Sequence, residues 1–196
     1  MIIGIVGGVG SGKSEVLNII KRRFGARIIM ADAIGAKIMK AGEPGFEPIV
    51  ELFGPEVIGA DGELDREYIA SRVYKDEMLM GRLEAIVHPL VKKEVKSYVE
   101  HLDPDEICFY ECAIMFETGS DEICHKICGI ITDDDIRIQR LQENRGYSPE
   151  KSREIMSKQM SCDELRKRCD FVIENNRGKE ELEAQVMEVL EKYFVK

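Results

Sequence analysis

The chain begins with residues whose order suits phosphate binding. Residues 7–14 read Gly-Gly-Val-Gly-Ser-Gly-Lys-Ser and fit the pattern G-x-x-x-x-G-K-[ST]. Glycines allow successive backbone N–H groups to curve around phosphate oxygens, and a following helix adds partial positive charge. Lys13 is expected to reach the β- and γ-phosphates of ATP and to act in catalysis, and the Ser14 hydroxyl is expected to ligate Mg²⁺. The expected ATP-binding residues here are Gly8, Val9, Gly10, Ser11, Gly12, Lys13, Ser14 and Glu15.

A second reactive group, Asp32, directly follows the apolar run 27–31. If that run is a strand, Asp32 lies at the carboxyl edge of the sheet, where the phosphate loop also opens. Its carboxylate could accept the proton of an attacking hydroxyl, or hold Mg²⁺ through water. The alternative role is a helix N-cap for residues 33–40, and the two roles are compatible.

Basic residues crowd the segment 135–168, which has helical periodicity. One interpretation is a solvated helical face. The other is a mobile lid that closes over phosphates with one or two arginines. The basic residues are Arg137, Arg140, Arg145, Lys151, Arg153, Lys158, Arg166, Lys167 and Arg168.

These groups need a scaffold, and the apolar runs of the chain predict one. Each run is continuous rather than alternating, as expected of strands covered on both faces. Helical stripes fill the gaps, and strand–helix–strand alternation implies a parallel sheet. We therefore predict an α/β fold: a five-stranded parallel sheet of the P-loop kinase type, flanked by helices, in one domain spanning 1–196. The predicted strands are 2–6, 27–31, 107–112, 127–132 and 171–173.

Two stretches are too long for simple crossovers between strands. Residues 55–104 are nearly all helical in pattern, with predicted breaks at Asp61-Gly62 and His88-Pro89. We expect this stretch to be a helical substrate-binding region. We expect residues 135–168 to be the helical lid.

Composition restricts the classes of partner that we expect for this protein. The 196 residues carry a formal net charge of −9, which argues against nucleic acid. No stretch approaches the roughly 20 apolar residues of a spanning helix, so we expect a cytoplasmic protein with a small-molecule substrate and no membrane partner. The six cysteines are then reduced thiols, and core packing is a better interpretation of them than a zinc site. They are Cys108, Cys112, Cys124, Cys128, Cys162 and Cys169.

The phosphate loop alone does not identify the reaction, because GTPases, motor ATPases and small-molecule kinases share it. The chain has no Asn-Lys-x-Asp guanine motif, and Thr132-Asp133-Asp134 only weakly imitates a Walker-B site. One short predicted helix links the first two strands, as in nucleotide and metabolite kinases. The pattern favours a kinase.

Over nearly its whole length the chain resembles the dephospho-coenzyme A kinases. The most specific motif is Leu83-Glu84-Ala85-Ile86-Val87-His88-Pro89-Leu90-Val91. The others are the phosphate loop, Ala31-Asp32, Gly42-Glu43-Pro44-Gly45, Asp61-Gly62-Glu63-Leu64-Asp65-Arg66, Phe116-Glu117, Arg140 leading to Gln159, and Asp170-Phe171-Val172-Ile173-Glu174-Asn175.

The resemblance implies a nucleotide core, a helical region for the coenzyme substrate, and a lid. It implies transfer of the ATP γ-phosphoryl group to the ribose 3′-hydroxyl of dephospho-coenzyme A. Asp32 then matches the family's base, while Arg140 and Asn175 match positions that contact ATP. Arg66 and His88 fall on the substrate side, although His88 could equally be a helix-breaking residue that only packs.

Some residues depart from the family pattern. Met30 replaces the first acid of an Asp-Ala-Asp motif, and Glu15 replaces the usual Thr after the loop. Glu111 and Ala113 stand where Asp and Pro are usual, and Glu111 could keep the Asp role. Asn144 occupies the position of a second lid arginine, with Arg145 one residue later, and Leu165 replaces a common basic residue. Two alternatives therefore stay open: a kinase for another metabolite or nucleoside, and a non-catalytic ATP-binding relative.

Overall fold

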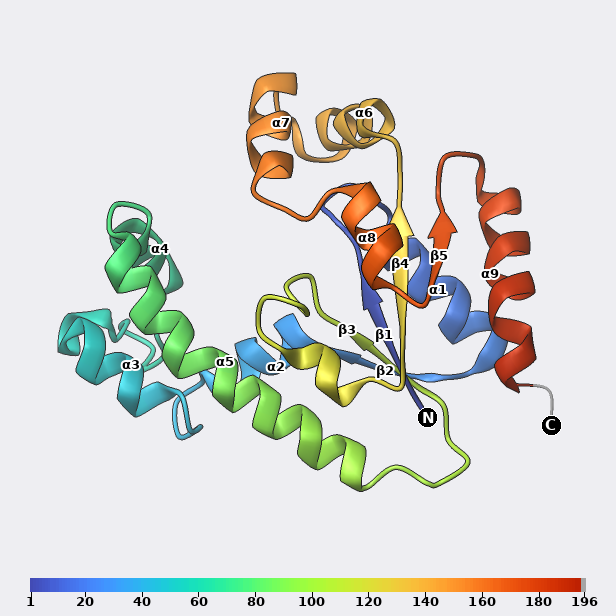
Figure 1. Cartoon of the computed structure of the whole chain (residues 1–196). Coiled ribbons are helices and arrows are strands. Elements are labelled where there is room, and N and C mark those ends of the chain that lie inside the picture. The colour runs from blue at the N-terminus through green and yellow to red at the C-terminus, as the bar shows by residue number, and fades with distance from the viewer. Residues whose placement is uncertain (195–196) are drawn as a thin grey trace. The chain divides into compact units, whose positions relative to one another are not determined.

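The computed structural model describes residues 1–194 and divides the chain into two compact units. The first is formed by Met1–Ile29 together with the chain from Asp103 onward. The second is the segment Met30–Leu102 (Figure 1). Among the described helices, none combines the length and the apolar character that a membrane crossing needs.

A five-stranded sheet in the order β2-β3-β1-β4-β5 organises the first unit. Its strand β1 pairs in parallel with β3 and with β4, and β4 pairs in parallel with β5. The predicted parallel sheet is confirmed, and each strand lies within two residues of its expected bounds. The strands are β1 (Ile2–Val6), β2 (Arg27–Met30), β3 (Cys108–Glu111), β4 (Lys126–Ile131) and β5 (Phe171–Glu174).

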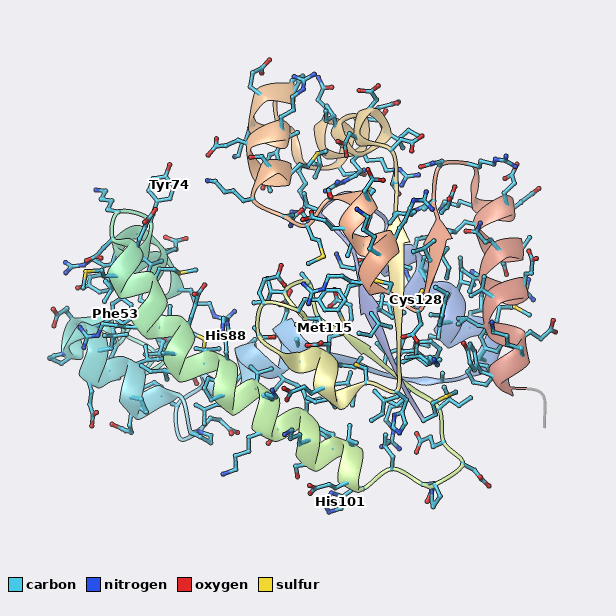
Figure 2. All side chains as sticks on the ribbon, in the orientation of Figure 1. Phe53, Tyr74, His88, His101, Met115 and Cys128 are labelled. Carbon is cyan, nitrogen blue, oxygen red and sulfur yellow. The ribbon has the colours of Figure 1, made fainter. Side chains whose placement is uncertain are left out.

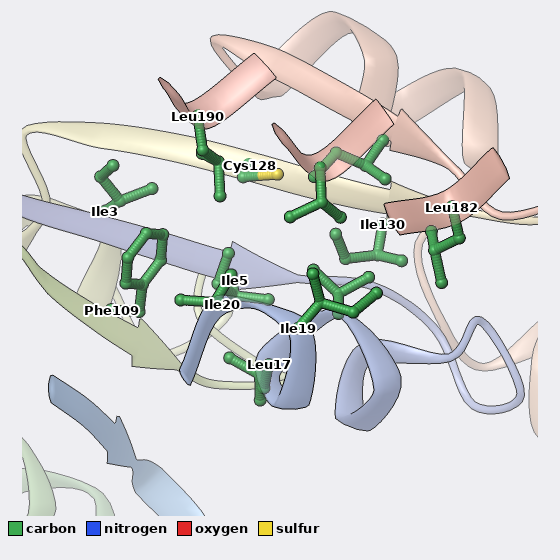
Figure 3. Packing of buried hydrophobic residues seen from close by; sticks show 13 residues of the cluster. Ile3, Ile5, Leu17, Ile19, Ile20, Phe109, Cys128, Ile130, Leu182 and Leu190 are labelled. Carbon is green, nitrogen blue, oxygen red and sulfur yellow. The ribbon is translucent and has the colours of Figure 1, made fainter. Parts of the chain in front are cut away.

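Two helices cover one face of this sheet, α1 (Lys13–Phe24) and α9 (Lys179–Phe194). Alternate residues of a strand point to opposite faces, so Ile3 and Ile5 share the face that meets the two helices. Both isoleucines are fully buried (Figure 3). Buried residues of α1 and α9 pack in the same core: Val16, Ile19, Ile20, Leu182, Val186 and Leu190.

The opposite face of β1 is covered by the segment that follows β3. A Cβ placed on Gly4 would lie 2.8 Å from both Cys124 Sγ and Met115 Sδ, so no larger residue fits there. Met115 is fully buried, and the short 3-10 helix η2 (Ser120–Ile123) closes the segment. The phosphate loop therefore leaves a strand that is packed on both faces.

Three helices link β4 to β5: α6 (Asp134–Arg145), α7 (Pro149–Ser157) and α8 (Cys162–Arg168). They confirm the helical prediction for residues 135–168. Side-chain caps explain where two of them begin. Ser148 accepts from the backbone of Lys151, and Ser161 forms a capping box with Glu164. Figure 1 shows α6 and α7 beyond the carboxyl end of β4.

The second unit is helical and has its own core. Its elements are α2 (Ala31–Ile38), α3 (Phe46–Phe53), η1 (Pro55–Val57), α4 (Arg66–Val73) and α5 (Glu77–Glu100). Phe46, Ile49 and Phe53 form a buried cluster against the apolar face of α5. The predicted break at Asp61-Gly62 is confirmed as a turn, in which Gly62 has φ 81°.

The predicted break at His88-Pro89 is wrong, because α5 runs through both residues. Figure 2 labels His88 beside the uninterrupted ribbon of this helix. A proline inside a helix removes one backbone hydrogen bond and crowds the preceding turn. Here Leu83, Ile86 and Val87 pack on the core of the second unit, and Val95 is also buried. Burial on both sides of the proline outweighs its local cost.

The N-cap role predicted for Asp32 is also wrong. Strand β2 ends at Met30, one residue earlier than predicted, and α2 begins at Ala31. Met30 is the N-cap residue, and Asp32 lies in the first helical turn. A carboxylate in that turn still interacts favourably with the helix dipole.

We predict that Pro89→Ala stabilises the protein. Proline is about 3 kcal/mol less favourable than alanine inside a helix, and the unfolded chain regains about 0.4–1 kcal/mol of freedom. The expected net gain is about 2 kcal/mol, measured as a higher melting temperature by calorimetry. Pro149→Ala is the control, because Pro149 is at the first position of α7, where proline is favourable. A melting temperature lowered by Pro89→Ala would contradict this account.

Candidate active site

The phosphate loop connects β1 to α1 through residues 7–12. Gly10 has φ 76° and Gly12 has φ 86°, a left-handed region that favours glycine. Gly12 is the N-cap of α1, and its carbonyl accepts from the backbone of Glu15 at 3.0 Å. The free N–H groups at this helix end provide a binding site for an anion.

Lys13 lies beside a buried carboxylate. Its Nζ donates to the Gly7 carbonyl at 2.7 Å and lies 4.0 Å from Glu111 Oε1. Glu111 is 6% exposed, and the sheet register pairs it with Ile5 near the end of β1. The structure therefore places Glu111, one of the residues that differ from the family pattern, beside the lysine of the phosphate loop.

Asn175, which follows β5, supports the phosphate loop at Ser11. Its Nδ2 donates to the Ser11 carbonyl at 2.9 Å. The Thr132 hydroxyl donates to the same carbonyl at 3.1 Å and is buried. A Cβ on Gly12 would lie 2.1 Å from Asn175 Nδ2, so the amide occupies the space that any other residue at position 12 would need.

Arg140, on α6, contacts the same support. Its Nη2 donates to the Asn175 backbone oxygen at 3.0 Å and to Asn175 Oδ1 at 3.3 Å. Its Nη1 is buried without a hydrogen-bond partner among residues 1–194, and lies 3.6 Å from the Cβ position of Gly12. A buried cationic donor left unsatisfied is costly, so this nitrogen is suited to an anionic ligand at the loop.

Two further residues at the loop were not singled out as ligands by sequence reasoning, Arg137 and Gln159. Arg137 Nε donates to the Val9 carbonyl at 2.9 Å, and the Val9 N–H donates to Gln159 Oε1 at 2.9 Å. Arg137 was only one of nine basic residues in a charge run. Its spacing from Ile138 and Leu141, which are also buried on α6, was the signal that could have found it.

A small pocket of about 50 Å³ lies next to the start of the loop. It is lined by Gly7 and Gly8, by Phe116 and Glu117 from the segment after β3, and by Lys158 among others. The Phe116-Glu117 motif therefore lies at the phosphate loop. The Arg168 guanidinium stacks over the Phe116 ring at 3.9 Å and ties this segment to α8.

The remaining predicted site residues belong to the second unit. Asp32 lies on α2, and Arg66 begins α4 and donates to the Ala36 carbonyl at 3.4 Å. His88 is half-buried on α5, which packs against both α2 and α4. The structure thus groups these three residues on neighbouring helices. Their approach to the phosphate loop stays a prediction.

Three of the other five residues that depart from the family pattern, Asn144, Leu165 and Glu15, have local explanations. Asn144 donates to the Arg140 carbonyl at 2.8 Å within α6, and Arg145 is exposed at the end of that helix. Leu165 is buried on α8, so an apolar residue suits that position. Glu15 lies 4.0 Å from the exposed Lys179. Met30 and Ala113 are exposed, and no contact explains them.

Three of the six cysteines are core residues, as predicted. Cys108, Cys112 and Cys128 are buried, and Cys124, Cys162 and Cys169 are partly exposed. Burial raises the pKa of Cys108 to about 11, with a smaller contribution from Glu106. Burial, helped by a neighbouring aspartate, raises the pKa of Cys124 and of Cys169 to about 12. These thiols therefore keep their protons at neutral pH.

We predict a loss of stability at alkaline pH. An unfolded thiol loses its proton near pH 9.0, whereas the folded protein retains it to higher pH. Each raised pKa therefore makes its full contribution to the free energy of unfolding below about pH 9, and this contribution declines as the pH rises toward 12. The melting temperature should fall between pH 8 and pH 10.5, and less steeply for Cys169→Ala. Equal slopes for the two proteins would contradict the assignment to this thiol.

We predict that Gly12→Ala weakens binding of a non-hydrolysable ATP analogue at least about tenfold, comparable to losing one charge-assisted hydrogen bond. The added methyl group would displace Asn175 and with it the support of the loop. Gly25→Ala is the matched control. Gly25 also has a left-handed φ of 60° but no atom within 4 Å of its Cβ position. The control should lose about 1–2 kcal/mol of stability and keep its affinity. Equal losses of affinity, measured by calorimetry, would contradict the prediction.

Comparisons with known proteins agree with this geometry. A family model described as dephospho-CoA kinase matches residues 1–181. The dephospho-CoA kinase of Geobacillus kaustophilus (strain HTA426) is 32% identical over 195 residues, covering 98% of this chain and 96% of that protein. A solved structure from Thermus thermophilus has a TM-score of 0.84 at 30% identity, covering 100% of this chain and 98% of that one. Dephospho-CoA kinase from Campylobacter jejuni has a TM-score of 0.75 at 22% identity, covers 97% of this chain and 96% of its own, and supports the fold. The chain belongs to the dephospho-CoA kinase family, whose members are P-loop kinases.

Proposed function

We propose that this protein transfers the γ-phosphoryl group of ATP to the ribose 3′-hydroxyl of dephospho-coenzyme A and so forms coenzyme A. Family membership supports the substrate. The observation that carries the nucleotide half of the proposal is the unsatisfied, buried Nη1 of Arg140 beside Gly12. A polyphosphate at the loop would satisfy it.

The residues of the first unit fit a magnesium–ATP ligand. At Gly8, Gly10 and Gly12 there is no room for a side chain, because Arg137, Leu141 and Asn175 occupy the space where one would lie. Lys13 carries a positive charge to the loop. The exposed Ser14 hydroxyl, in the first turn of α1, is the proposed magnesium ligand, since magnesium prefers oxygen donors. Bound magnesium would neutralise phosphate charge. The proposed ATP ligands also include Val9, Ser11, Glu15, Arg140 and Asn175.

The residues of the second unit are proposed to receive the acceptor. Asp32 takes the proton of the 3′-hydroxyl as its oxygen attacks the γ-phosphorus, and the bond between that phosphorus and the β–γ bridging oxygen breaks. ADP leaves with the electron pair of that bond. Arg66 and His88 bind the coenzyme substrate. These roles rest on the family resemblance and on the grouping of the three residues on α2, α4 and α5.

We assign the two helical stretches corresponding roles within one kinase domain. Residues 55–104 would form the substrate-binding region. Residues 135–168 would form a lid that brings Arg140 to the triphosphate and excludes water, which would otherwise compete as acceptor. We further propose a cytoplasmic protein without a nucleic-acid partner, on its net charge of −9 and its cysteine content.

A substrate panel with detection of ADP tests the proposed reaction. With magnesium and ATP, dephospho-coenzyme A should be the preferred acceptor among nucleosides and other hydroxyl-bearing metabolites. A nucleoside as the better acceptor would identify a different kinase. ATP binding without turnover across the panel would identify a non-catalytic relative.

We predict that Lys13→Ala nearly abolishes turnover. The loss removes the only side-chain charge that the phosphate-loop motif itself supplies to the β- and γ-phosphates. The measurement is kcat with saturating dephospho-coenzyme A. Lys21→Ala, farther along α1, should leave kcat within about twofold, since surface charges act weakly at a distance. Near-normal turnover by Lys13→Ala would refute the phosphate-loop assignment.

We predict that Asp32→Asn lowers kcat about a hundredfold or more, the usual scale for a general base. The matched control is Glu47→Gln. Glu47 is an exposed carboxylate in the first turn of α3, as Asp32 is in α2, so it shares the helix-dipole contribution but has no proposed role in catalysis. An intact kcat for Asp32→Asn would show that another group accepts the proton.

A further inference from the structure

Arg137 makes three hydrogen bonds from a buried position. It is 4% exposed, although it belongs to a segment rich in solvated charge. Its Nε donates to the Val9 carbonyl at 2.9 Å, its Nη2 to Gln159 Oε1 at 3.3 Å, and its Nη1 to Asp134 Oδ1 at 3.2 Å. A guanidinium whose nitrogens all donate is held in one orientation.

Gln159 completes a closed triangle with Arg137 and Val9. Its Oε1 accepts from the Val9 N–H at 2.9 Å as well as from Arg137. Both backbone groups of Val9 are therefore held by side chains, and both side chains come from the segment between β4 and β5. Arg137 lies near the start of α6, and Gln159 follows α7.

The neighbouring loop residue shows how closely this pair packs. A Cβ on Gly8 would lie 2.2 Å from Arg137 Nη2 and 3.0 Å from Gln159 Oε1. The two side chains thus press against the backbone at Gly8 and bond to it at Val9. The loop has little freedom to shift at these residues while the pair is in place.

The charge of Arg137 also favours an anion at the loop. It forms an ion pair with Asp134, whose side chain is 70% exposed and therefore screened by water. Asn144, by contrast, is uncharged, and it bonds to the Arg140 carbonyl within its own helix.

We propose that Arg137 is a positioning residue for phosphoryl transfer. Together with Gln159 it holds both backbone groups of Val9, and it thereby fixes the phosphate loop in the form that receives the triphosphate of the nucleotide. The pair also ties that form to the placement of α6, which carries Arg140. This inference rests on the proposed function for the identity of the acceptor, but not for nucleotide binding.

Nucleotide binding and turnover, measured separately, test the proposal on the full chain. Arg137→Met removes the charge and the donors while keeping an unbranched side chain. It should weaken binding of AMP-PNP with magnesium about tenfold or more, and raise KM for ATP similarly, the effect expected for lost charge-assisted bonds. KM for dephospho-coenzyme A should stay within about twofold, since the residues proposed to bind the acceptor lie outside the phosphate loop.

Two further variants distinguish positioning from general stability. Arg137→Lys keeps the charge but lacks the planar fork, so it should recover only part of the AMP-PNP affinity. Gln159→Leu should weaken AMP-PNP binding too, and its combination with Arg137→Met should cost less than the product of the two single effects, because both act through Val9. Arg22→Met, at an exposed arginine in the last turn of α1, is the control and should match the wild type.

Different results would contradict the positioning role of Arg137 and the proposed function. A lowered melting temperature with unchanged AMP-PNP affinity in Arg137→Met would overturn the proposal and leave Arg137 with a structural role alone. If that variant does not fold, unchanged affinity in Gln159→Leu and Arg137→Lys would overturn it equally. A wild-type protein that binds AMP-PNP but does not phosphorylate dephospho-coenzyme A would refute the proposed function without affecting this inference.

Discussion

The geometry of the site depends on how the backbone of the phosphate loop is held open. Curling a chain so that its N–H groups face a ligand leaves carbonyls facing away, and a buried carbonyl needs a donor. Asn175 and Thr132 supply donors to the Ser11 carbonyl, and Arg137 supplies one to Val9. The loop is thus shaped by side chains that lie far from it in sequence. Glycine supplies the freedom to adopt this shape, and those side chains select it.

The sheet and its helices hold the phosphate loop and its supporting side chains in place. Fully buried residues of β1, α1 and α9 fix the strand before the loop and the helix after it (Figure 3). Strand β4 brings Thr132 to the loop, and β5 brings Asn175, because parallel neighbours end at the same sheet edge. The same edge leads into α6, where Arg137 and Arg140 lie one turn apart. The packing of the sheet therefore determines where the side chains of the phosphate-binding site lie.

Much of this could be predicted from the sequence, and the exceptions have physical reasons. Continuous apolar runs predicted five strands, because a strand buried on both faces leaves a local signature. The uninterrupted course of α5 through Pro89 could not be predicted, since the stabilising contacts are tertiary. Residue types and spacing alone placed Arg137 and Arg140 in the same charge run, and only the family resemblance singled out Arg140 as an ATP contact. Only the fold shows that the first is buried against Val9 and that the second keeps an unsatisfied nitrogen beside Gly12.

The most direct test of the central claim is hydrogen exchange of the backbone amides of residues 7–15, with and without AMP-PNP and magnesium. If those amides grip the triphosphate, their exchange should slow strongly on binding, while amides in the core of β1 stay equally protected in both states. Saturating nucleotide that leaves exchange in residues 7–15 unchanged would contradict the account, because the ligand would then be bound elsewhere.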